Sequence, residues 1–289
     1  MIHSKLILAF SLLLFFGCAK SSTDKSSADN GKPIAKGTRT CYPDNELLVS
    51  GIVGGSVVHK VDDDSKNVVM ILSGDQLCTA TAITKDILLT AAHCVKGSKA
   101  AETYMFTSST LSCESGFDSR RDRIGVRKIV VHEGYTSDEH SAEYSTNDLA
   151  LVILNRKLPA SYPIFPIADE NVVEPDSALY FWGFGEVGNG RGGDGLLRKT
   201  QVTSSEYNIS LVREKIIVNQ SAGHGICHGD SGGPGFIKQS GLLKILGVNS
   251  YVSGTTEASL CSGQSYLTLI SSYKVWLEKN LAIEGETLN

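Results

Sequence analysis

The sequence has no stripe of lysine and arginine with interleaved aromatic residues, and its net charge at pH 7 is −4. A nucleic-acid-binding surface needs such a positive patch, so we expect no nucleic-acid partner. No internal repeat divides the 289 residues, no long linker interrupts residues 52–281, and helical periodicity is scarce. What remains is the composition of an ordinary globular protein, with 41% hydrophobic and 20% charged residues.

The N-terminus also lacks an apolar run long enough to cross a membrane. Residues 6–16 are almost all Leu, Ile, Phe and Ala, short of the roughly 20 residues that a spanning helix needs. After a basic start, this run is typical of a secretory signal peptide, which we place at residues 1–17. Gly17 and Cys18 resemble a bacterial lipobox, in which the cysteine is lipidated and becomes the mature N-terminus. A plain signal peptide with an incidental cysteine is the alternative.

Residues 19–36 carry almost no bulky apolar side chain, so we expect a disordered tether. Together with Cys18 and the pro-segment it would occupy residues 18–51. A lipid anchor at Cys18 would hold an exported domain on the bacterial cell envelope, with the outer membrane favoured, and secretion is the alternative. Export suits the cysteines, because six of the seven remain for three disulfides once Cys18 is lipidated.

Short β-rich runs alternate with turn residues from residue 52 onward, a spacing that predicts an all-β barrel or sandwich. The expected strands are residues 67–72, 87–92, 124–132, 148–154, 178–185, 215–220 and 244–251. Residues 271–281 are the one good amphipathic helix, with Val275, Trp276 and Leu281 on its apolar side. The folded domain is therefore expected over residues 52–281, with a tail at residues 282–289.

Three motifs place reactive side chains beside apolar strands: His93 in "LTAAHC", Asp148 in "TNDLALVIL" and Ser231 in "GDSGGP". A serine hydroxyl is a weak nucleophile that needs a base, and histidine is the natural base near neutral pH. A buried carboxylate would fix the tautomer of the imidazole and stabilise its charged form. Flanking glycines let backbone N–H groups approach a developing oxyanion. The pattern favours nucleophilic catalysis by serine.

In this order, the three motifs resemble those of the chymotrypsin family of serine endopeptidases, over roughly residues 52–281. The resemblance implies two six-stranded antiparallel β-barrels, an active site between them and a C-terminal helix. It implies His93 as general base, Asp148 as the carboxylate that orients it and Ser231 as nucleophile. The backbone N–H groups of Gly229 and Ser231 would form the oxyanion hole.

Residues 52–55, "IVGG", add a second family mark. The resemblance implies a precursor that is cleaved before Ile52, whose new α-amino group then pairs with Asp230. Such a buried ion pair is a plausible switch, because either charge alone would be uncompensated. Gly51 stands where precursors activated by trypsin carry Arg or Lys. A protease that accepts small residues, including this enzyme itself, could therefore cut the bond.

The family pattern also implies two disulfides. Cys78–Cys94 would close the loop that carries the base, and Cys227–Cys261 would lie beside the specificity pocket. Cys41 and Cys113 have no counterpart in the pattern. A bond between them would tie the pro-segment to the catalytic domain after cleavage, and two free thiols are the alternative.

Substrate preference is expected from the residues that match the family's pocket. Gly225 would lie at its base, and without a carboxylate there we expect no preference for Arg or Lys. Val252 would shorten the pocket and favour small or medium aliphatic residues before the cleaved bond. Ser250 would hydrogen-bond the buried aspartate and begin the strand that pairs with substrate, followed by Tyr251, and His228 would line the cleft mouth.

Other readings fit less well. Residues 229–233 match the nucleophile elbow of α/β-hydrolases, but that fold needs a histidine after the serine and none follows Ser231. A subtilisin-like order could start at residues 62–64, but the helices of that fold are missing. A zinc site lacks ligand spacing in its candidates, which are His93, Cys94, Cys227 and His228.

The alternative from another functional class is a binding module, that is, a family member that has lost catalysis. It is disfavoured because every triad residue and oxyanion glycine is present. We expect protein or peptide substrates, a monomer, and neither metal nor cofactor.

Overall fold

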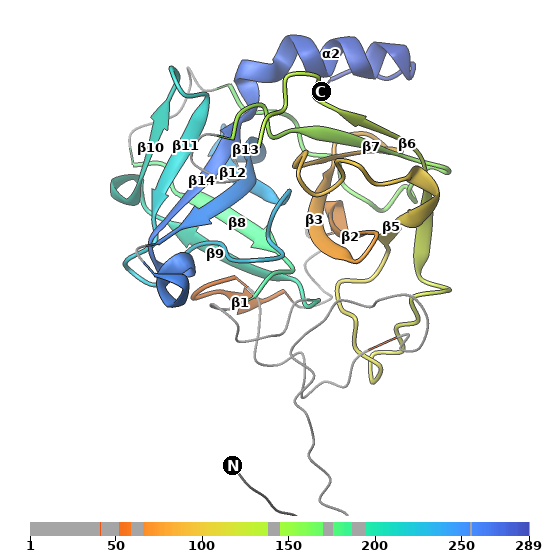
Figure 1. Cartoon of the computed structure of the whole chain (residues 1–289), viewed down its shortest axis with the longest axis horizontal. Helices are drawn as coiled ribbons and strands as arrows, with labels where there is room; N and C mark the ends of the chain where they lie inside the picture. Colours follow the sequence, from red (N-terminus) through yellow and green to blue (C-terminus); the bar gives the residue numbers. More distant parts are fainter. Residues whose placement is uncertain are drawn as a thin grey trace, which may run out of the picture.

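The computed structural model describes residue 41 and residues 52–58, 66–137, 145–169, 176–186, 195–254 and 256–288. Within them the chain forms two antiparallel β units side by side, with helix α2 (Lys274–Ile283) along one end of the molecule (Figure 1). The predicted signal peptide, Cys18 and the tether lie outside the described residues. No helix in the described part of the chain is long and apolar enough to cross a membrane.

The first unit is a closed six-stranded barrel in the order β2-β3-β4-β7-β6-β5. Its strands are β2 (Val68–Ser73), β3 (Gln76–Ala82), β4 (Ile87–Thr90), β5 (Thr103–Phe106), β6 (Arg123–Val131) and β7 (Ala150–Leu154). Every residue of β2, β4 and β7 is buried, which explains why these segments are continuous apolar runs in the sequence.

The second unit is an eight-stranded sheet in the order β1-β9-β8-β12-β13-β14-β11-β10. Its strands are β1 (Ser56–Val57), β8 (Leu179–Gly183), β9 (Arg198–Val202), β10 (Tyr207–Ser210), β11 (Lys215–Asn219), β12 (Pro234–Gln239), β13 (Leu242–Ser253) and β14 (Gln264–Leu269). The prediction of two closed barrels is therefore wrong for this half. Its edge strands, β1 and β10, each pair with one neighbour only among the described residues, which leaves the sheet open.

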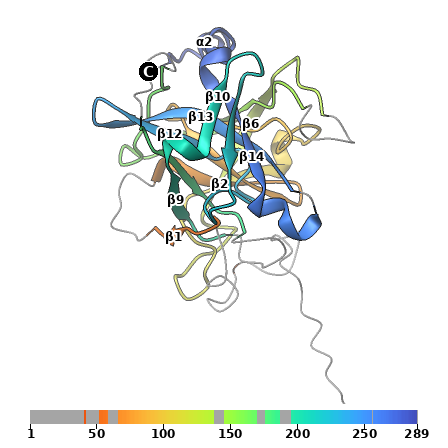
Figure 2. The ribbon, with the colours of Figure 1, turned by 90° about the vertical axis from the view of Figure 1, so that its left-hand side faces the viewer.

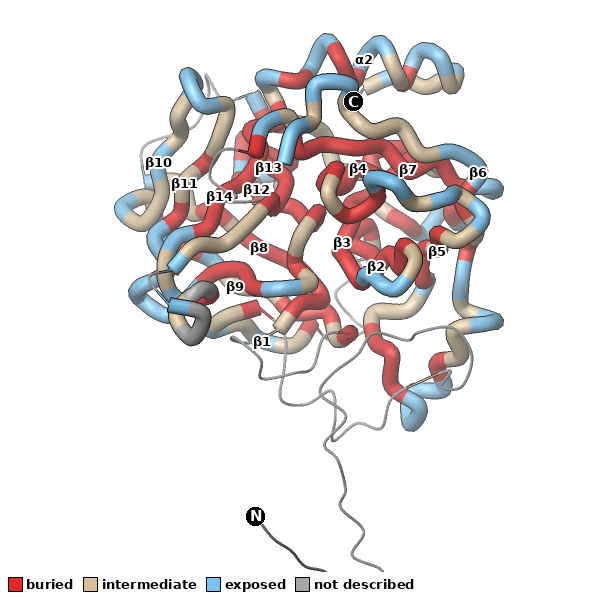
Figure 3. Tube along the Cα trace, in the orientation of Figure 1, coloured by how far each residue is buried: buried red, intermediate tan, exposed pale blue. Residues whose placement is uncertain are grey.

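The two units share one apolar interface. The rings of Phe165, Trp182 and Phe236 contact one another edge to face, with centroids 5.2 to 6.4 Å apart. Trp182 on β8 and Phe236 on β12 belong to the same buried cluster as the side chains of the first barrel. Figure 3 shows the buried residues concentrated in both units and where they meet. This packing holds the two units against each other and so fixes the walls of a cleft that lies between them.

All seven expected strands are present, with bounds that differ by a few residues at most. The C-terminal helix is also present, but it begins only at Lys274, after a 3-10 turn (Ile270–Tyr273). The prediction for Val275 is wrong, because its side chain is 80% exposed, while Trp276, Leu277 and Leu281 are buried. Figure 2 shows the second unit from the side, with β1 and β9 at the end opposite α2.

Candidate active site

The imidazole of His93 lies in a buried turn that follows β4. Ala91 and Ala92, just before it, are fully buried, and the N–H of Lys96 donates to the carbonyl oxygen of Ala92. A disulfide between Cys78 on β3 and Cys94 braces the same turn. A hydrogen bond and a disulfide thus hold the backbone on either side of His93 in place.

Asp148 lies just before β7 and contacts His93 through two hydrogen bonds. The backbone N–H of His93 donates to Oδ1 at 2.9 Å, and Nδ1 of the ring lies 2.8 Å from Oδ2. The hydroxyl of Ser250 on β13 donates to Oδ2 at 2.5 Å. Asp148 is 3% exposed, so this carboxylate holds the imidazole from within the protein.

The environment of Asp148 favours its charged form. Burial alone would raise the pKa of this carboxyl, but the charge and hydrogen bonds of His93 and the hydroxyl of Ser250 outweigh it. The pKa of Asp148 is therefore held below its ordinary value. An ionised Asp148 accepts the Nδ1 proton of His93, which leaves Nε2 without a proton when the imidazole is neutral.

Ser231 lies between the two β units. Its carbonyl oxygen accepts a hydrogen bond from the N–H of Thr79 on β3 at 2.8 Å, and the N–H of Gly232 donates to Asn249 on β13 at 2.8 Å. Gly232 has φ of +80°, and a Cβ there would lie 2.0 Å from the hydroxyl of Thr90, so only glycine fits. Ser231 lines one cleft of about 930 Å³ with His93 and Asp148.

The cleft also contains most of the other predicted site residues. Its lining includes Gly229, His228, Ser250, Tyr251 and Val252. Gly229 has φ of +88°, and its carbonyl oxygen accepts a hydrogen bond from the hydroxyl of Thr79 at 2.9 Å. The residue between it and the serine, Asp230, is fully buried and does not line the cleft.

Residues 52–277 match the family model described as Trypsin. The chain belongs to the trypsin family. Chymotrypsin-like elastase family member 1 of Macaca fascicularis is 27% identical over 80% of this chain and 90% of its own length. The protein of the same name from Felis catus is 28% identical over the same shares. Transmembrane protease serine 11E of Mus musculus is 26% identical over 90% of this chain and 61% of its own length.

Family membership makes the chain a serine endopeptidase. These relatives are animal proteins, and they give no support to the bacterial lipoprotein that the N-terminal sequence predicts.

In this trypsin-family chain, Ile52 and Asp230 are both fully buried but do not line the cleft. The Asp230 carboxylate accepts hydrogen bonds from the N–H of Gly185 at 2.8 Å and of Cys227 at 2.9 Å. The segment that starts at Ile52 reaches the same region, because the N–H of Gly225 donates to the carbonyl oxygen of Val53 at 3.1 Å. The two predicted partners thus lie in segments that meet beside Gly225.

Two residues that the family pattern does not name, Gln220 and Ile226, lie beside Gly225, the predicted base of the pocket. Gly225 is not among the described residues that line the cleft, whereas its neighbour Ile226 lines it together with Val252. The amide of Gln220 fills the space beside Gly225, where a Cβ would lie 1.9 Å from Oε1. That amide is fully buried and bonds the backbone of Ile226 on one side and of Cys261 on the other. Ile226 could have been noticed as a branched residue next to Gly225, but nothing in the sequence marks Gln220.

Three disulfides are formed in the structure, between Cys41 and Cys113, Cys78 and Cys94, and Cys227 and Cys261. Cys41 and Cys113 are therefore bonded to each other in the structure and are not free thiols. The bond from Cys41 to Cys113 joins the predicted pro-segment to the loop between β5 and β6, across 72 residues of sequence.

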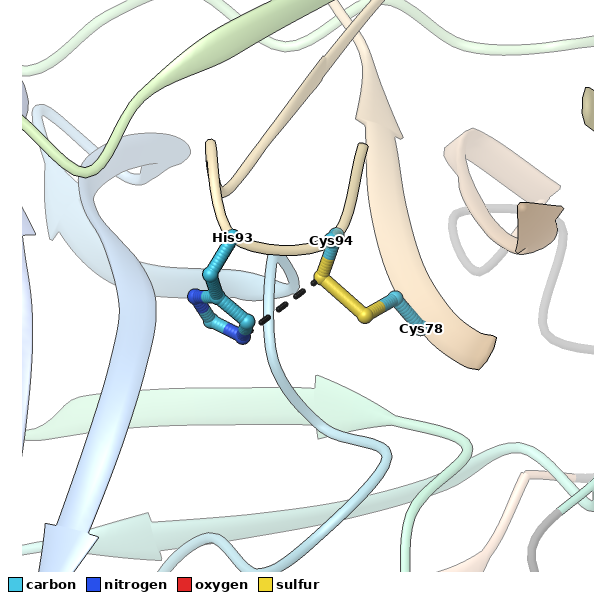
Figure 4. A group of neighbouring side chains, drawn as sticks. All are labelled: Cys78, His93 and Cys94. Atoms are coloured by element: carbon cyan, nitrogen blue, oxygen red, sulfur yellow. Dashed lines mark hydrogen bonds between the residues drawn. A yellow bond between two sulfur atoms is a disulfide. The ribbon is translucent and has the colours of Figure 1, made fainter. Parts of the chain in front are cut away.

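A cluster of sulfur and nitrogen atoms beside the cleft has the composition of a metal site but not its chemistry. Cys78, His93 and Cys94 place their potential ligand atoms within 4.8 Å of one another. Figure 4 shows why they do not form such a site: the two sulfurs are bonded to each other, and Nε2 of His93 lies 3.7 Å from Sγ of Cys94. A metal would need thiolates, which this disulfide does not offer.

Proposed function

We propose that the enzyme hydrolyses peptide bonds through an acyl-enzyme on Ser231. The proposal rests on the 2.8 Å contact between Nδ1 of His93 and Asp148 beside Ser231 in one cleft. His93 takes the proton of the Ser231 hydroxyl as the oxygen attacks the carbonyl carbon, and then gives it to the leaving amine. Water repeats these steps to release the acyl group. Asp148 stays ionised and stabilises the imidazolium that forms in between.

The oxyanion would be stabilised by two backbone N–H groups. The carbonyl of His228 accepts a hydrogen bond from the N–H of Glu186, and the carbonyl of Asp230 accepts one from the side chain of Asn249. In a trans peptide the N–H points away from the preceding carbonyl. The N–H groups of Gly229 and Ser231 therefore point away from these partners, which supports their role as the oxyanion hole.

Cleavage before Ile52 would supply the activating charge. The free α-amino group would pair with Asp230, whose carboxylate already accepts hydrogen bonds from the N–H groups of Gly185 and Cys227. The full burial of both residues supports this role.

We also propose that Ile226 and Val252 shorten the pocket and restrict the residue before the cleaved bond to small or medium aliphatic side chains. Gly51 at the activation bond fits that preference.

Attachment through a lipidated Cys18 is proposed from the sequence alone. Protein lacking the lipid would be released from membranes, so a Cys18→Ser variant should be found in the soluble fraction. Equal membrane association of both proteins would contradict the anchor.

Peptide hydrolysis by protein that starts at Ile52 tests the proposed reaction. We expect peptides with Ala or Val before the cleaved bond to be cleaved, and peptides with Arg or Lys there to be cleaved poorly. A Ser231→Ala variant of the same processed protein is the matched control and should lose activity by several orders of magnitude. Equal rates for the two proteins would contradict the assignment of Ser231.

A further inference from the structure

The described lining of the cleft is asymmetric in charge. It contains no lysine or arginine, and outside the triad its carboxylates are those of Asp75 and Glu186. Asp75 lies in the turn between β2 and β3 and is exposed, and Glu186 follows β8 and is half-buried. Carboxylates that line a cleft attract cationic groups more strongly than the same charges on a convex surface, because the walls focus the field.

Asp75 lies on one side of the nucleophile. The segment around Ser231 is held between β3, through Thr79, and β13, through Asn249. Since β3 begins at Gln76, directly after Asp75, this carboxylate belongs to the β3 side of the cleft.

Glu186 belongs to the same side. Two residues before it, the N–H of Phe184 donates to the hydroxyl of Thr79 on β3 at 3.2 Å. The N–H of Glu186 donates to the carbonyl oxygen of His228 at 2.7 Å, next to the proposed oxyanion donor Gly229. Through these contacts the segment of Glu186 adjoins both β3 and the segment of Gly229.

On the opposite side, the nearest described cation lies behind a lining residue and does not line the cleft itself. Tyr251 on β13 lines the cleft and stacks on Tyr266, with ring centroids 4.4 Å apart. The ammonium of Lys215 lies 4.7 Å from the centroid of the Tyr251 ring and donates to its hydroxyl at 3.0 Å. The ammonium of Lys96 lies equally far, 4.7 Å, from the ring centroid of Tyr135, which also lines the cleft. Among the described residues, the two carboxylates are therefore the charges in the lining itself that distinguish its sides.

We propose that Asp75 and Glu186 select substrates with lysine or arginine in the first residues after the cleaved bond. The proposal rests on the proposed function, in which β13 pairs with the residues before that bond. The residues after it then lie on the β3 side, where the two carboxylates are. A cationic side chain there gains attraction from both, and an acidic one is repelled by both.

Competing peptides test this preference in processed protein that starts at Ile52. The peptides share Ala before the cleaved bond and differ only in the second residue after it, which is Lys, Gln or Glu. We expect kcat/KM to fall in the order Lys, Gln, Glu. Asp75→Asn and Glu186→Gln should each lower the ratio of Lys to Gln by about two- to five-fold, the size typical of partly exposed charge pairs. Glu278→Gln, which removes an exposed carboxylate on α2, is the matched control and should leave the ratio unchanged.

Salt gives an independent readout that a packing change would not move. In about 1 M salt the screening length falls to about 3 Å, so the preference of the unmodified enzyme for Lys should largely disappear. Cleavage of all three peptides at equal rates, unchanged by Asp75→Asn, would overturn this inference and leave the proposed function standing. Failure to cleave any of the peptides would overturn the proposed function and this inference with it.

Discussion

The N–H of Thr79 donates a hydrogen bond to the carbonyl oxygen of Ser231 at 2.8 Å. The hydroxyl of the same residue donates to the carbonyl of Gly229 at 2.9 Å and accepts from the N–H of Phe184 at 3.2 Å. Thr79 is fully buried on β3 of the first barrel, whereas its three partners belong to the second half of the chain. One threonine of the first barrel thus holds the loop that carries Ser231 and the end of β8.

Replacing Thr79 by valine should damage both stability and catalysis. The substitution keeps the shape but leaves the carbonyl of Gly229 and the N–H of Phe184 without their buried partner. We expect the free energy of unfolding to fall by about 1–3 kcal/mol and kcat to fall because the proposed oxyanion donors lose a support. Denaturant unfolding and peptide kinetics measure the two effects. Thr79→Ser keeps the hydroxyl and should retain most of the activity, and an equal loss in both variants would contradict this role of the hydroxyl.

Removing the hydroxyl of Ser250 should produce a stability loss that depends on pH. Because the folded pKa of Asp148 lies below its unfolded value, the ionised carboxylate stabilises the protein above about pH 4, and this contribution is lost as pH falls through the folded pKa. Ser250→Ala removes one hydrogen bond to that charge, which should cost about 1.5–3 kcal/mol near neutral pH. Unfolding measured between about pH 2.5 and pH 7 should show the difference shrinking in acid. A constant difference across this range would count against the link to Asp148.

Processing should leave the pro-segment attached. The bond from Cys41 to Cys113 crosses the proposed cleavage site, so the cleaved protein should migrate as one species without reductant and as two species with it. A Cys41→Ala, Cys113→Ala protein should release its pro-segment without reductant. Release of the segment from the unmodified protein under the same conditions would contradict a persistent disulfide.

Shortening Val252 should widen the specificity pocket. Val252→Ala removes two methyl groups from the cleft lining, so peptides with Phe or Leu before the cleaved bond should gain about ten-fold in kcat/KM relative to peptides with Ala. Val212, which is 98% exposed in the turn between β10 and β11, offers the matched control Val212→Ala. An unchanged preference in Val252→Ala would exclude this residue as a pocket wall.

Much of the fold could be predicted because its central strands are apolar throughout. Residues 68–73 and 150–154 are buried on both faces, and such runs are visible in sequence. By contrast, β9 and β10 mix polar and apolar residues and lie toward the edges of the open sheet, so they carry no comparable signal. The predicted closure of the second unit depends on pairing between distant strands, which local pattern does not report.

The candidate site likewise contains residues that the sequence predicts and residues that only the structure reveals. His93, Asp148 and Ser231 stand in motifs that their chemistry makes recognisable. Gln220 and Thr79, in contrast, act through side-chain hydrogen bonds to the backbone of Cys261 and of Gly229. Because their partners lie 41 and 150 residues away in sequence, only the folded chain reveals these roles.

Labelling with a fluorophosphonate probe is the most direct test of Ser231 as an activated nucleophile. Protein processed to begin at Ile52 should gain one adduct, and peptide mapping by mass spectrometry should place it on Ser231. Ser231→Ala should gain none, and His93→Gln should react far more slowly because the base is gone. Processed, folded protein that forms no adduct on Ser231 would contradict the account and favour a member of the trypsin family that has lost catalysis.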